Sequence, residues 1–288
     1  MPASWGSVAR RGTRQLSQEG AGPASLAWRE AVARARGEDD GRERSSEVWI
    51  RDEEPAVPAR TRDAAPGPRA PGARPRPRPA KLPQEVGTEL ADQVGSGRAP
   101  RLTQRLAEAT RDYERERYRD AVKILKPLAD EAPGSPAVRE LYGLTRYRLG
   151  HWHEAIKELE ALRTLSGTYD QHPTLADCYR ATKRWAKVEE LWEDLRRASP
   201  GPDLVTEGRI VAAGALADRG RVAEAIDRLD QGKPEVRRPK PHHLRLWYAL
   251  GDLYERAGDL TKARHYFRRV LDADPELYDT AERLAAIG

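Results

Sequence analysis

The histidines and the single cysteine are the side chains of this 288-residue chain that could most readily bind a metal ion or take part in catalysis. His153-Glu154 begins a His-Glu-x-x-His zinc motif, but Lys157 stands where the second histidine ligand belongs. The remaining candidates do not follow a known zinc-ligand spacing: His151, His153, His172 and Cys178. We therefore expect neither a metal site nor a cofactor.

Catalytic and phosphate-binding motifs are also missing from the sequence. It contains no Gly-x-x-x-x-Gly-Lys-Ser/Thr, no Gly-x-Gly-x-x-Gly and no Gly-x-Ser-x-Gly. Cys178 has no base paired with it and is expected to be an inert buried thiol. The run Arg115-Glu116-Arg117 is interpreted as ordinary ion pairs on a helix face. His242-His243 follows Pro241 and is interpreted as a solvated helix start. The chain is expected not to be an enzyme.

Four tryptophans provide the other candidate chemistry, since aromatic rings can stack on nucleic-acid bases. Their positions in the helical pattern favour packing instead: Trp152, Trp185, Trp192 and Trp247. Residues 101–288 carry 34 basic and 32 acidic side chains, so this part lacks the basic surplus of a broad nucleic-acid interface.

The first 80 residues differ in composition from the rest. Twelve of the 22 prolines lie in residues 1–100, and Arg74-Pro75-Arg76-Pro77-Arg78-Pro79 favours an extended polyproline conformation. We expect residues 1–80 to form a disordered, Pro/Arg/Gly-rich tail. Within it, Ser25–Arg36 and Val48-Trp49-Ile50 are either docking motifs or isolated apolar residues.

Neither a membrane segment nor a leader sequence is expected. No stretch approaches about 18 consecutive apolar residues, and no apolar segment follows Arg10-Arg11. We expect a cytoplasmic protein that does not contact a membrane.

Helical spacing dominates from residue 81 onward, which predicts an all-α fold. Val86, Leu90 and Val94 share one face of a predicted capping helix within residues 81–97. From residue 98 to residue 288, helical patterns alternate with glycine and proline breaks, and no segment alternates with a period of two.

The helices come in pairs that repeat a pattern. The last pair reads Trp-x2-Leu-Gly-x2-Tyr from Trp247 to Tyr254, followed by Ala263, Phe267 and Pro275. This pattern resembles the tetratricopeptide repeat (TPR) family. Small or short residues recur at intervals of 34, 33, 37 and 38 residues: Ala121, Ala155, Val188, Ala225 and Ala263. The resemblance implies a helix-hairpin solenoid of about five repeats and a C-terminal capping helix over residues 98–288. The chain also resembles actinobacterial TPR proteins of undefined activity.

The resemblance implies that the first helix of each pair lines a concave groove. The predicted groove residues are Tyr113, Leu144, Tyr147, Asp177, Arg180, Tyr248, Asp252 and Glu255. We expect the tyrosines and Leu144 to be exposed apolar anchors, and Asp252 and Glu255 to form an acidic end that suits a basic flank of a bound peptide. The alternative is that these residues only solvate the superhelix.

Two functions follow as hypotheses. The first is a non-catalytic scaffold or adaptor that binds a protein or peptide in its groove. The second is a nucleic-acid-associated factor whose Arg-Pro tail contacts phosphates while the repeats recruit a partner.

Overall fold

The structure is a computed structural model that describes residues 82–230, 236 and 238–288. The tail predicted to be disordered over residues 1–80, with its Val-Trp-Ile and Arg-Pro segments, lies outside the described residues. The described part contains twelve helices and no strand, so the all-α prediction is confirmed. The helices are α3 (Gln84–Val94), α4 (Ala99–Glu114), α5 (Tyr118–Glu131), α6 (Pro136–Arg148), α7 (Trp152–Ser166), α8 (His172–Ala181), α9 (Trp185–Ala198), α10 (Pro202–Asp218), α11 (Val222–Asp230), α12 (Pro241–Arg256), α13 (Leu260–Ala273) and α14 (Thr280–Ala286).

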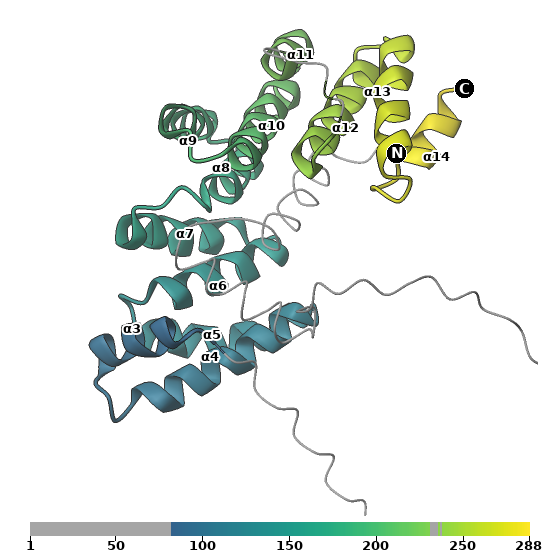
Figure 1. Cartoon of the computed structure of the whole chain (residues 1–288). Helices are drawn as coiled ribbons and strands as arrows, with labels where there is room; N and C mark the ends of the chain where they lie inside the picture. The colour runs from purple at the N-terminus through teal and green to yellow at the C-terminus, as the bar shows by residue number, and fades with distance from the viewer. Residues whose placement is uncertain (1–81, 231–235, 237) are drawn as a thin grey trace, which may run out of the picture.

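Five helical hairpins follow one another in a curved stack (Figure 1). They are α4–α5, α6–α7, α8–α9, α10–α11 and α12–α13, and in each the two helices pack against each other. The second helix of a hairpin also packs against the first helix of the next one. A single hairpin cannot cover its apolar stripe, so this stacking is what creates a continuous core.

Small residues set the distance between the two helices of a hairpin. The five residues that recur in the second helices are all at most 1% exposed. Glycines of the facing first helices leave room for larger side chains of the second helices. A Cβ atom added to Gly251 would lie 2.7 Å from the nearest ring carbon of Phe267, and one added to Gly143 would lie 2.7 Å from Leu159 Cδ2. The predicted repeat register is therefore correct at these positions.

Each end of the stack is covered by an additional helix. Val86, Leu90 and Val94 of α3 are buried in the first core cluster, as their four-residue spacing predicts. At the other end α14 packs against α13, and Leu284 and Ile287 contact the last cluster.

The turns inside the hairpins share one backbone conformation. The residue two positions before the second helix has positive φ, and in three hairpins it is a glycine: Gly150, Gly220 and Gly258. Glu116 and Lys183 occupy the same position in the other two hairpins, with φ of 58° and 60°. L-residues rarely adopt this region because Cβ crowds the backbone there.

Candidate functional site

The first helices line the inner side of the curve. Close contacts link α4 to α6, α6 to α8, α8 to α10 and α10 to α12, whereas successive second helices stand further apart. We call the surface of these five first helices the inner face. It is the only surface that runs through every hairpin of the described part on adjacent helices.

In the middle hairpins, the predicted groove residues bind one another. The Tyr147 hydroxyl donates a hydrogen bond to Asp177 Oδ2 over 2.7 Å, and Arg180 Nε donates to Asp177 Oδ1 over 2.8 Å. Arg180 also pairs with Asp218 on the next first helix. Burial alone lowers the pKa of Arg180, but the carboxylates of Asp177 and Asp218 more than reverse this effect. This chain of contacts joins α6, α8 and α10.

The prediction of exposed apolar anchors is wrong for three residues. Tyr147 is 1% exposed, Tyr248 is fully buried and Leu144 is 7% exposed. The next first helix, α8, brings Asp177 onto Tyr147, and the start of the capping helix α14 brings Asp279 onto the Tyr248 hydroxyl. Only Tyr113 and Glu255 of the predicted groove residues keep partial exposure.

The predicted acidic end is also corrected by the structure. Arg283 of α14 donates to Asp252 Oδ1 over 3.0 Å and to Glu255 Oε2 over 2.6 Å. Arg256 Nε lies 3.0 Å from Asp252 Oδ2, and Asp252 is 1% exposed. Burial raises the pKa of Asp252, while the two arginines oppose that rise. The capping helix thus neutralises the charge that was expected to attract a basic flank.

A second surface, which we call the turn edge, follows the turns inside the hairpins. It consists of the residue pairs that join each turn to its second helix: Arg117-Tyr118, His151-Trp152, Arg184-Trp185 and Arg221-Val222. The side chains of Arg117 and Arg221 are 54% and 42% exposed, and they pair with Asp120 and Glu224 in the first turns of α5 and α11. Their aromatic or apolar neighbours are partly exposed. Each of these pairs places a basic side chain next to an aromatic or apolar one.

The first two turns of the turn edge contact each other. The guanidinium of Arg148 lies 5.2 Å from the ring centroid of Tyr118 and 3.8 Å from Glu116 in the preceding turn. Aromatic rings connect the turn edge to the inner face, because Tyr118 meets Tyr113 edge-on at 5.4 Å. Cation–π contacts of this kind hold a guanidinium at a fixed place on the surface.

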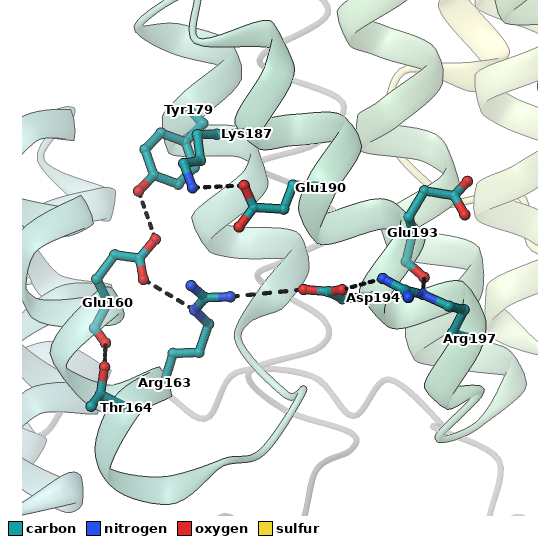
Figure 2. Close-up of polar contacts among 9 residues, drawn as sticks. All are labelled: Glu160, Arg163, Thr164, Tyr179, Lys187, Glu190, Glu193, Asp194 and Arg197. Atoms are coloured by element: carbon teal, nitrogen blue, oxygen red, sulfur yellow. Dashed lines mark hydrogen bonds and ion pairs between the residues drawn. The ribbon is translucent and has the colours of Figure 1, made fainter.

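Arg184, in the central hairpin, is held by a polar network that Figure 2 shows in part. Its guanidinium lies 4.7 Å from the ring centroid of Tyr179, whose hydroxyl donates to Glu160 over 2.6 Å. Glu160 in turn accepts from Arg163, which reaches Asp194 on α9. Burial and the bond to Glu160 raise the pKa of Tyr179. The network connects α7, α8 and α9 beneath Arg184.

Sequence reasoning missed the turn edge because it assigned Arg115-Glu116-Arg117 to a helix face. The structure instead places Glu116 at the positive-φ turn position and Arg117 directly before α5. Aligning the run with Gly150-His151 and Gly220-Arg221 would have revealed the turn. The interpretation of the histidine pair as a solvated helix start holds only for His243, which is partly exposed and accepts from the backbone N–H of Lys240, whereas His242 is buried beside Asp203.

The tryptophans and the cysteine follow the packing interpretation more closely. Trp192 and Trp247 are buried in the core, whereas Trp152 and Trp185 are partly exposed at the turn edge. Cys178 is fully buried, and burial raises the pKa of its thiol well above the usual value. The described residues contain no group of three or more potential metal ligands and no helix long and apolar enough to span a membrane.

Comparisons with known proteins agree with this architecture. Two family models described as tetratricopeptide repeat match the chain, one over residues 106–170 and one over residues 244–277. Among solved structures, a TPR protein of Thermus thermophilus, TTC0263, aligns with a TM-score of 0.50 and 19% identity over 65% of this chain and 98% of its own. A second TPR structure, YrrB, is described as having an unusual peptide-binding site. It aligns with a TM-score of 0.39 and 16% identity over 62% of this chain and 89% of its own. No curated protein matches the chain.

Proposed function

The chain belongs to the tetratricopeptide repeat family, and on that premise we propose that it is a non-catalytic scaffold that binds a protein or peptide along its inner face. The observation that carries the proposal is the continuity of this face, because five first helices contact one another without interruption. A surface of this kind can contact an extended or helical segment at several repeats in succession.

The buried polar chain gives this surface a fixed shape. Tyr147, Asp177 and Arg180 are buried and join α6 to α8, and Arg180 extends the link to the exposed Asp218 on α10. Breaking such a group of contacts leaves unpaired charge inside the protein, so the helices keep one spacing. A surface with fixed spacing loses less conformational entropy when it binds a ligand.

Ligand contacts then come from the groove residues that reach solvent. Tyr113 at one end is partly exposed and is in edge-to-face contact with Tyr118. Glu255 at the other end is partly exposed and bound to Arg283. We assign the remaining predicted groove residues the role of holding the first helices in place. A tyrosine is a suitable anchor because it contributes a large contact area at a modest entropic cost.

The test is a selection of displayed random peptides on the full chain, followed by titration of the selected peptides against variants. Tyr113→Ala should weaken binding by about 5- to 30-fold, the range of an interface hot spot. Tyr169→Ala is the matched control, because Tyr169 is also a partly exposed tyrosine but lies in the loop between α7 and α8. Equal losses in both variants, or no loss in either, would contradict binding at the inner face.

A further inference from the structure

We propose that the turn edge binds the acidic segment of the same chain at residues 38–54, with Trp49 as its apolar anchor. This inference goes beyond the proposed function, since it concerns a different surface and a ligand within the chain itself.

The turn edge carries more positive charge than the repeats as a whole. The five turns at residues 114–117, 148–151, 181–184, 218–221 and 256–259 contain eight Lys or Arg and four Asp or Glu. Residues 101–288 together contain 34 basic and 32 acidic residues. Four of these cations, Arg117, Arg148, Arg221 and Arg256, are ion-paired with carboxylates of the repeats. The surplus is therefore centred on the central turn, which has Lys183 and Arg184 and no carboxylate. A concentrated surplus attracts an anionic segment and accelerates its association.

Four second helices begin with a residue that does not suit a helix N-terminus. Arg117, His151 and Arg184 precede α5, α7 and α9 without a side-chain cap, and Arg221 precedes α11. Cations are unfavourable there because the helix dipole places positive charge at the N-terminus. An acidic residue in the first turn offsets this effect in α5, α7 and α11, but α9 has none. The last hairpin shows the usual solution, in which the Asp259 carboxylate accepts from the backbone N–H of Lys262 over 3.0 Å.

The central turn adds a strained residue to this arrangement. Lys183 has φ of 60° at the position where other hairpins have Gly150, Gly220 or Gly258. A glycine would adopt this conformation at lower free energy. Lys183 and Arg184 are both exposed and adjacent to the partly exposed Trp185. The sequence thus keeps two cations beside an aromatic ring at a place where both are unfavourable for folding.

Residues 38–54 have the complementary chemistry. They contain eight of the eleven acidic residues of the first 81 positions and only three arginines. Val48-Trp49-Ile50 lies between Glu47 and the Asp52-Glu53-Glu54 run. Carboxylates on both sides of an aromatic residue match the central turn, where the exposed Lys183 and Arg184 precede the partly exposed Trp185.

The connecting chain is long enough to allow this contact. Residues 55–81 form a connection of 27 residues to Leu82, which precedes α3. A chain of 27 residues can span at most about 90 Å. Three steps of about 10 Å between neighbouring helices lead from α3 through α4 and α6 to α8. The central turn is therefore within reach, and tethering raises the effective concentration of the segment.

The experiment is zero-length carbodiimide cross-linking of the full chain, with mass spectrometry to identify the linked residues. Lys183 should form amide bonds with Asp52, Glu53 or Glu54 in higher yield than Lys126 does. Lys126 is an exposed lysine on α5 and serves as the control. Equal yields from the two lysines would overturn the proposal.

The variant Arg184→Asp distinguishes an effect on binding of the segment from an effect on folding. Asp at this position should cap α9 as Asp259 caps α13, so the unfolding midpoint should stay the same or rise by a few degrees. The cross-link from Lys183 should nevertheless fall at least fivefold, and Trp49→Ala should reduce it as well. An unchanged yield in Arg184→Asp would overturn the proposal.

Two further experiments identify which molecule binds at the turn edge. In a mixture of isotope-labelled and unlabelled chains, the cross-links should join residues of the same chain, and a predominance of mixed pairs would overturn binding in cis. An equimolar single-stranded oligonucleotide should leave the yield unchanged at 0.15 M salt. Loss of the cross-link would assign the turn edge to nucleic acid instead. Neither result affects the Tyr113 titration, so the two proposals fail independently.

Discussion

Two glycines in helices provide a sharp test of how the hairpins pack. Gly87 in α3 has no atom within 4 Å of an added Cβ, whereas a Cβ at Gly251 in α12 would lie 2.7–3.0 Å from three ring carbons of Phe267. The same substitution, glycine to alanine, should therefore have opposite effects at these two positions.

The magnitudes follow from helix propensity and packing. Alanine in a helix interior is favoured over glycine by about 0.8–1 kcal/mol, and Gly87→Ala should stabilise the fold by nearly this amount. At Gly251 the same gain is opposed by overpacking against a fully buried ring, which costs about 1–3 kcal/mol. Because the ring is fully buried, we expect the packing cost to exceed the gain in helix propensity and Gly251→Ala to destabilise the protein by about 1 kcal/mol.

Chemical denaturation followed by helical circular dichroism measures both effects. The packing explanation adds a second requirement, which is that Phe267→Leu should relieve the contact and make Gly251→Ala less harmful in the double variant. If Gly251→Ala is as stabilising as Gly87→Ala, the close approach of α12 and α13 in the structure is incorrect.

Three other predictions concern the interior and the tail. Tyr147→Phe should destabilise the fold by about 1 kcal/mol in denaturant titration because Asp177 loses a hydrogen bond, whereas Tyr147→Ala should cost about 3–5 kcal/mol and cannot serve as a pure binding variant. Burial, and to a smaller extent Arg163, lowers the pKa of His172 to about 4. Since the unfolded chain protonates near pH 6.5, stability should fall as the pH drops from 6.5 toward 4. By pH 5 the free energy of unfolding should have fallen by about 2 kcal/mol. The variant His172→Gln should remove this pH dependence in the same titrations. Removing residues 1–80 should leave the helical signal of the repeats intact and change the unfolding midpoint little, because the described core begins at Leu82.

The sequence was sufficient for the features that depend on contacts within one hairpin. The spacing of Ala155, Val188 and Ala263 identifies the repeat register, because a small residue is required wherever two helices touch. Val86, Leu90 and Val94 identify α3 for a similar local reason. Periodicity and turn residues carry this information directly.

The inner face could not be predicted at the same level because its exposure depends on the next hairpin. Whether Tyr147 reaches solvent is decided by α8, which packs over it and supplies Asp177. Whether the Asp252 carboxylate can attract a ligand is decided by Arg283, which pairs with it and is 31 residues away in the sequence. Contacts between repeats depend on the curvature of the stack, and no local pattern encodes it.

Binding at the inner face is the central claim, and hydrogen–deuterium exchange on the full chain tests it most directly. Exchange is compared with and without a saturating peptide from the display selection. Amides of the first helices α4, α6 and α8 should exchange more slowly in the complex, while those of the second helices α5, α7 and α9 should change less. Protection confined to the second helices or to residues 1–80, with the first helices unchanged, would contradict the claim.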